Sequence, residues 1–127
     1  MKTLKISANN EISIIDVNFD DFRSIQKALG GYFETVHTAK MGNYFQGPVI
    51  MLVDEDGYFK SLPLTRFGSW MYDMPRHGAP ILGDVILAEA HFEDITAVQE
   101  PEKLMEKLMD DFEFLKKVEE IRHEHEN

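Results

Sequence analysis

Residues 62–72 combine the residue types that a binding pocket uses. They include Arg66, Tyr72 and Trp70, which is the only tryptophan of the chain. Arginine can hold an anionic planar ligand such as a nucleotide through charge-assisted hydrogen bonds, while aromatic rings stack on the planar group. The segment therefore predicts a site that binds, and could sequester, a small anionic ligand such as a nucleotide signal.

Other residues complete this hypothesis. The expected ligand-binding residues are Arg66, Trp70, Tyr72, Tyr44 and Thr65. The glycine- and proline-containing residues 73–83 would form a lid over the ligand. The same pattern has a structural alternative, in which the aromatic residues of 65–72 are the core face of a short helix and Arg66 faces solvent.

The acidic end of the chain supports a different function. Residues 93–127 carry 12 acidic and 5 basic side chains. Strong charge steers association with an oppositely charged partner. The second hypothesis is therefore an acidic, DNA-mimic-like module that occupies a basic surface of another protein. Its expected partner-binding residues are Glu106, Asp110, Asp111 and Glu113.

Catalysis is the third hypothesis and has the least support. The chain contains no cysteine, no Gly-x-Ser-x-Gly motif and no phosphate-binding glycine loop. His123 and His125 alternate with glutamates at the end of the chain, but their spacing specifies no third metal ligand. We therefore predict binding rather than catalysis, with no catalytic residue, metal or cofactor.

Composition narrows the class of protein. The 127 residues are 43% hydrophobic and carry a net charge of -10, which favours one globular domain and argues against direct nucleic-acid binding. The longest apolar run, at 49–53, is too short to span a bilayer, and no apolar signal sequence follows Met1. The expected location is the cytoplasm.

Hydrophobic patterning predicts an α+β domain with a small, mostly antiparallel sheet. Expected strands lie within 2–17, 32–39, 49–53, 58–60 and 84–90. A short helix starting near Asn18 would end at Gly30, because glycine accepts the left-handed conformation of a helix C-terminus. A second short helix would follow Thr65, and residues 40–47 would form a loop.

A long amphipathic helix is expected to complete the domain, so that 1–92 form an α+β core and 93–127 an acidic C-terminal helix. Its apolar stripe consists of Leu104, Met105, Leu108, Met109, Phe112, Leu115, Val118 and Ile121. The stripe would cover the sheet of its own chain or, alternatively, meet the same helix of a second copy in a homodimer.

Four segments occur in an order that resembles a known family. They are Gly30-Gly31-Tyr32-Phe33-Glu34-Thr35-Val36, Val53-Asp54-Glu55-Asp56-Gly57, Leu62-Pro63-Leu64-Thr65-Arg66 and residues 78–87. This order resembles a small domain-of-unknown-function family of phages, plasmids and conjugative elements, with Thr65 where that family usually has asparagine. The resemblance covers about residues 4–90. It implies a compact α+β domain in a mobile-element accessory protein, a kind of protein that often acts on host defence.

Overall fold

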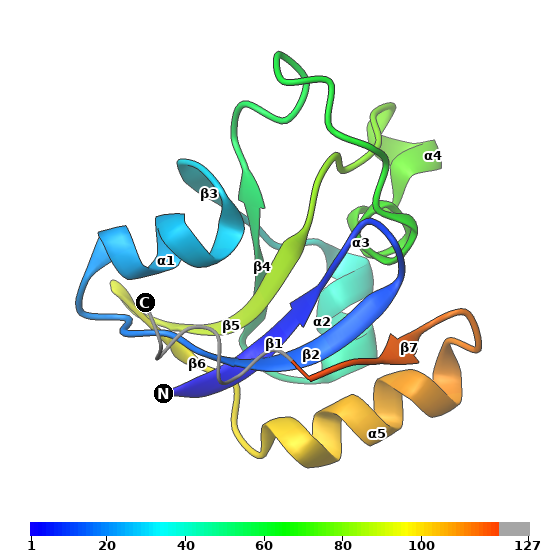
Figure 1. Cartoon of the computed structure of the whole chain (residues 1–127). Coiled ribbons are helices and arrows are strands. Elements are labelled where there is room, and N and C mark those ends of the chain that lie inside the picture. The colour runs from blue at the N-terminus through cyan, green and yellow to red at the C-terminus, as the bar shows by residue number, and fades with distance from the viewer. Residues whose placement is uncertain (120–127) are drawn as a thin grey trace.

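The computed structural model describes residues 1–119 and has an α+β architecture (Figure 1). Seven strands form one sheet: β1 (Lys2–Ile6), β2 (Glu11–Asp16), β3 (Phe33–Val36), β4 (Val49–Asp54), β5 (Val85–His91), β6 (Asp94–Ala97) and β7 (Lys116–Lys117). Five short helices accompany them: α1 (Phe22–Leu29), α2 (Ala39–Phe45), α3 (Arg66–Tyr72), α4 (Met74–His77) and α5 (Pro101–Asp111). No helix in this part of the chain is long and apolar enough to cross a membrane.

Strand β5 organises the sheet, whose order is β3-β4-β5-β1-β2-β7. One edge of β5 pairs with β4, while the other edge is shared by β1 near its start and β6 near its end. The Thr3 hydroxyl bridges the place where β1 and β6 separate, since it donates to the Leu87 carbonyl and accepts from the Val98 amide. This buried side chain therefore connects β1, β5 and the segment that leads to α5.

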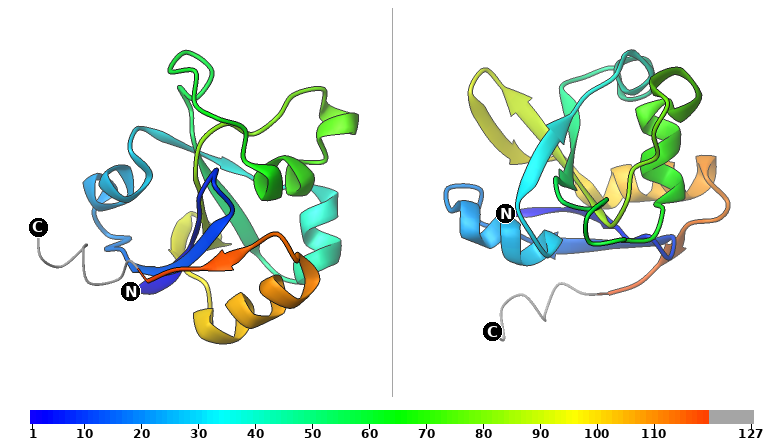
Figure 2. Two further views of the ribbon diagram at one scale, coloured as in Figure 1. Left: turned by 45° about the vertical axis from the view of Figure 1, so that its right-hand side comes forward. Right: turned by 90° about the horizontal axis from the view of Figure 1, so that it is seen from above.

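Both faces of the central strands are covered, as the apolar run at 49–53 predicts. Val49, Met51 and Val53 pack in the layer that includes side chains of α2, α3 and α5. Ile50 and Leu52 pack on the opposite face against α1. Figure 2 shows α1 on one side of the strands and α2, α3 and α5 on the other side.

The sheet differs from the expected mostly antiparallel one because it is mixed. Strand β7 runs parallel to β2, with Glu11 opposite Lys116 and Ile12 opposite Lys117. Two consecutive lysines give no apolar alternation that would predict a strand. Their position follows from tertiary contacts, since Leu115 is buried in the core and the Val118 amide donates to the Ile12 carbonyl.

The prediction of a long C-terminal helix over 93–127 is wrong. Strand β6 occupies the start of that range, and α5 has only 11 residues. The helix ends where Phe112 takes an extended conformation, with φ -125° and ψ 93°. Met105 and Leu108 of the predicted stripe are buried in the core of the same chain. The stripe residue Ile121 lies outside the described residues.

Two shorter predictions are also wrong. Of residues 40–47, expected as a loop, 40–45 belong to α2, because the Thr38 hydroxyl caps the Met41 amide and Met41 is fully buried. Residues 58–60 form turns instead of a strand, and the Tyr58 and Phe59 side chains are almost fully exposed. Local propensity underestimates the helical tendency of the segment that forms α2, because tertiary packing of its apolar side chains stabilises the helix.

Candidate functional site

Three distant segments bring aromatic side chains together on the face formed by α2, α3 and the residues after α5. Tyr44 of α2 and Trp70 of α3 lie with their ring centroids 6.4 Å apart. Phe112 lies between them, with its centroid 5.7 Å from that of Tyr44 and 5.2 Å from that of Trp70. Trp70 remains 43% exposed, so the cluster presents an aromatic surface to solvent.

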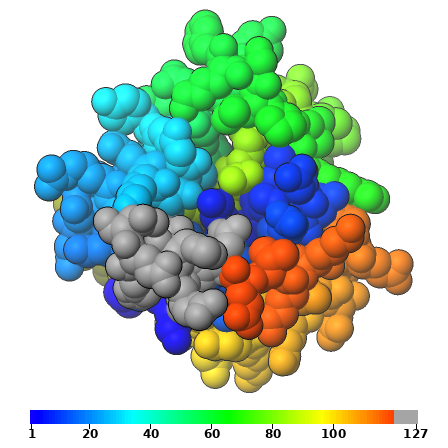
Figure 3. All heavy atoms as spheres, viewed as in Figure 1, coloured from blue at the N-terminus to red at the C-terminus, as the bar shows by residue number. Residues whose placement is uncertain are grey.

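Carboxylates border this cluster. The exposed residues Asp110, Asp111 and Glu113 line one open depression together with Arg66, Phe112 and Phe114. We call the following set the aromatic–acidic surface: Tyr44, Trp70, Phe112, Phe114, Asp110, Asp111 and Glu113. The chain that follows α5 runs along the outside of the molecule beside the β1–β2 turn (Figure 3).

Basic side chains of the same chain lie over three of these rings. The Lys40 Nζ is 3.7 Å from the Trp70 centroid, and the Lys107 Nζ is 4.1 Å from that of Tyr44. The Arg66 guanidinium carbon is 4.2 Å from the Phe114 centroid. Cations are attracted to the electron-rich faces of aromatic rings. The surface therefore has the chemistry of a site for ammonium or guanidinium groups.

A hydrogen bond joins the aromatic and acidic parts. The Tyr44 hydroxyl donates to Asp111 Oδ2 over 2.5 Å, and Lys107 lies 3.0 Å from the same oxygen. The hydrogen bond from Tyr44, followed by that from Lys107, lowers the pKa of the Asp111 carboxyl. Partial burial, followed by the same hydrogen bond, raises the pKa of Tyr44. Asp111 is therefore held in its charged form.

Replacing Tyr44 by phenylalanine is expected to raise the pKa of Asp111 toward its usual range. A carboxyl whose folded-state pKa is lowered stabilises the fold above its unfolded pKa, and this contribution is lost as pH falls through the folded pKa. Tyr44→Phe should therefore flatten the acid dependence of stability. Carboxyl-carbon NMR titration measures the pKa directly. Tyr72→Phe is the control, and an unchanged Asp111 pKa in Tyr44→Phe would contradict the assignment.

The two sets of residues that the sequence singles out fall largely on one surface. Arg66, Trp70 and Tyr44 from the first set adjoin three of the four acidic residues from the second. Tyr72 is elsewhere, since its ring stacks on His77 with centroids 4.9 Å apart. Glu106 lines a different groove, between α5 and the β2–β7 region.

Sequence reasoning missed Phe112, Phe114 and Lys107. Phe112 was assigned to the helical apolar stripe, whereas the structure ends α5 at Asp111 and places Glu113 and Phe114 in a turn. No local pattern marks that turn, so the sequence did not indicate that Phe112 and Phe114 join the cluster.

The comparisons with known proteins give a family. The model described as "Domain of unknown function (DUF3846)" matches residues 1–113. The chain belongs to the DUF3846 family. The match includes α5 and all three acidic residues of the aromatic–acidic surface. No curated protein and no solved structure matches the chain. The expected membership of a domain-of-unknown-function family is thus confirmed.

Thr65 lies beside the aromatic–acidic surface but is inaccessible to a ligand. Its side chain is fully buried, and its hydroxyl has no hydrogen-bond partner among the described residues. Its backbone amide donates to the Ile81 carbonyl, which ties the start of α3 to the segment before β5. The geometry therefore indicates a structural position.

Thr65→Val is expected to increase the free energy of unfolding by about 1–3 kcal/mol, because a buried hydroxyl without a partner costs that much. Urea denaturation monitored by circular dichroism measures the change. Thr3→Val is the matched control and should destabilise, since the Thr3 hydroxyl makes two buried hydrogen bonds. Destabilisation by Thr65→Val would show that its hydroxyl is satisfied.

The segments that carry the sequence resemblance meet at another end of the sheet. Residues from three of the four segments line a groove formed by the end of β4, the following turn and residues 78–82. Close packing accounts for several of them: a Cβ at Gly57 would lie 2.9 Å from the Leu82 carbonyl oxygen, and buried Asp54 pairs with Lys60 at 2.7 Å. Several residues of these segments therefore have a role in packing.

The described part of the chain contains no candidate metal site. No group of three or more potential ligands of the His, Asp or Glu type gathers among residues 1–119. His123 and His125, whose spacing specifies no third metal ligand, lie outside the described residues.

Proposed function

We propose that this protein is a non-catalytic binding module that captures an arginine- or lysine-rich surface of another protein through the aromatic–acidic surface. One observation carries the proposal: the carboxylates of Asp110, Asp111 and Glu113 border the depression that Phe112 and Phe114 line, and basic side chains already lie over the neighbouring rings. A partner's guanidinium could contact a ring and a carboxylate together.

Net charge favours the same kind of partner. The chain carries a charge of -10, which attracts a basic protein at long range and increases its association rate. Exposed Trp70 adds the type of side chain that is enriched among residues with large effects on protein binding. The proposal thus combines long-range attraction with a local site for cations.

Binding of a small anionic ligand is the second candidate. The observation that favours it is the position of Arg66, Lys40 and Lys107 over rings of one surface, where they could meet a negative group. The three neighbouring carboxylates repel an anion, and one of them, Asp111, already pairs with Lys107. We therefore rank this candidate below the basic partner.

The proposal includes a biological setting. We place the activity in a phage or mobile-element accessory protein that acts in the host cytoplasm and counters a component of host defence. This setting is supported by a sequence resemblance to a protein family that such elements carry. The resemblance lies in residues 30–36, 53–57, 62–66 and 78–87.

Substitution of Arg66 has opposite expected effects on binding of a basic partner and on binding of an anionic ligand. Its guanidinium occupies the ring of Phe114 and the acidic depression, as a partner's arginine would. Arg66→Ala should therefore tighten binding of a nine-residue arginine-rich peptide by up to about fivefold, the scale of one exposed ion pair. It should abolish binding of a mononucleotide if the anionic candidate is correct.

Calorimetric titration of wild type and Arg66→Ala with both probes tests the proposal. Arg23→Ala is the matched control, because Arg23 is exposed on α1 and its loss changes the net charge equally. Peptide binding that responds equally to both substitutions would refute a local site. Nucleotide binding that is lost only in Arg66→Ala would favour the second candidate.

A further inference from the structure

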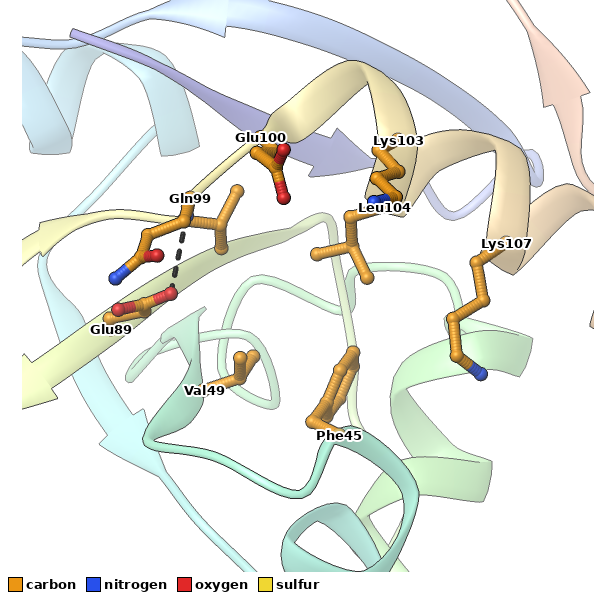
Figure 4. A pocket seen from close by; sticks show the side chains of 9 residues that line it. Phe45, Val49, Glu89, Gln99, Glu100, Lys103, Leu104 and Lys107 are labelled. Carbon is orange, nitrogen blue, oxygen red and sulfur yellow. Dashed lines mark hydrogen bonds between the residues drawn. The ribbon is translucent and has the colours of Figure 1, made fainter.

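A separate cavity, open to solvent, lies between the start of α5, the end of α2 and the strands β4 and β5. It has a volume of about 330 Å3, at the lower end of the range for small-molecule sites. Figure 4 shows Glu89 and Glu100 on one side of it, with Leu104, Val49 and Phe45 around the remaining space. The cavity therefore combines two carboxylates with an apolar wall.

Glu89 is an unusual residue for its position. It follows Val85 and Leu87 on the inner face of β5, and its side chain is only 9% exposed. Burial of a carboxylate is costly unless hydrogen bonds or opposite charges compensate. The Gln99 amide donates to its Oε2 over 3.2 Å, and His91 Nε2 lies 2.9 Å from its Oε1. These contacts use about half of the acceptor capacity of a carboxylate.

Glu100 adds the second carboxylate from the residue that precedes α5. Its backbone has φ 46°, a left-handed conformation that non-glycine residues adopt at a cost, and its side chain makes no capping hydrogen bond with the helix. In Figure 4 this side chain extends toward the cavity from the start of α5. The conformation at Glu100 thus brings a second carboxylate to the same space as Glu89.

Among the described residues, neither lysine that lines the cavity forms an ion pair with Glu89 or Glu100. Lys107 extends away from both carboxylates in Figure 4 and contacts Asp111 over 3.0 Å. Lys103 is exposed, so that its ammonium group is hydrated, whereas Glu89 is buried. An incoming ammonium group would therefore meet the buried carboxylate of Glu89, whereas the competing ammonium group of Lys103 remains in water.

We infer that this cavity binds a small organic ammonium compound with an apolar body. The ammonium group donates to the carboxylates of Glu89 and Glu100, and the body packs against Leu104, Val49 and Phe45. An ammonium has three donors and suits two carboxylates at once. The site is distinct from the aromatic–acidic surface, so that its test is independent of the proposed function.

Phenethylammonium is a suitable probe, with 2-phenylethanol as its uncharged analogue. Binding is followed by amide NMR shifts, with the Gln99 amide as reporter because it donates to Glu89. We expect saturable shifts of this amide with phenethylammonium and none with the alcohol. Glu89→Gln and Glu100→Gln should each weaken binding about tenfold, the scale of one hydrogen bond to a charged group.

Glu106→Gln is the matched control, because it removes the same charge from α5 in a different groove. If Glu89→Gln does not fold, exposed Glu100 provides the decisive variant. Equal weakening by Glu106→Gln, equal shifts with the alcohol, or no shift at Gln99 would each overturn the inference.

Discussion

Neutralising the acidic part of the aromatic–acidic surface is expected to weaken binding of an arginine-rich peptide by up to about a hundredfold. The variant carries Asp110→Asn, Asp111→Asn and Glu113→Gln. Each exposed ion pair lost reduces affinity by a factor of up to about five, and the three pairs act on one partner. Calorimetry at two salt concentrations measures the effect, and the salt dependence should fall along with the affinity.

The control removes three charges elsewhere. Asp20, Glu93 and Asp94 are exposed and line a depression beside α1 and β6, away from the aromatic–acidic surface. Their neutralisation changes net charge equally, so only the long-range attraction should weaken. If both triple variants lost the same affinity, the partner would respond to net charge alone and the proposed site would be wrong.

Phe67→Ala is expected to lower the free energy of unfolding by about 3–5 kcal/mol, the usual range for loss of a buried phenylalanine. Phe67 is fully buried, and its ring meets that of Phe112 edge-on with centroids 5.2 Å apart. Total stability of a domain is about 5–15 kcal/mol, so this loss is a large fraction. The support beneath Phe112 and the exposed aromatic rings would also be lost.

Urea denaturation followed by circular dichroism measures this change. Phe59→Ala is the control, because the Phe59 side chain is 87% exposed and its removal should alter stability by less than about 0.5 kcal/mol. Equal effects of the two substitutions would contradict the assignment of Phe67 to the core. Peptide binding should decrease in Phe67→Ala even where the variant remains folded.

Strong local signals predicted much of the fold. Strands β1 and β2 lie within the predicted 2–17, and the continuous apolar run at 49–53 became a strand buried on both faces. Gly30 ends α1 in the left-handed conformation, as expected, although the helix begins after Asp21 and not near Asn18. These features depend on interactions between residues that are close in the sequence, and local sequence patterns can therefore predict them.

The candidate site was predicted only in its components. Arg66 and Trp70 share one helix and were grouped correctly by proximity in the sequence, whereas Asp111 was assigned to a separate acidic helix. The Tyr44–Asp111 hydrogen bond joins residues 67 positions apart, and no local pattern indicates it. Phe112 was assigned to the stripe of a longer helix, so its place in the aromatic cluster was missed.

By itself, the sequence determined an α+β chain of charge -10 without cysteine, several of its strands, and the presence of the aromatic and acidic residues that the fold brings together. Tertiary structure alone decided where α5 ends and which residues share a surface. The physical reason is that Phe112 gains contacts with Tyr44, Phe67 and Trp70 by leaving the helix. Such long-range packing overrides helix propensity, which amounts to less than about 1 kcal/mol for an ordinary residue.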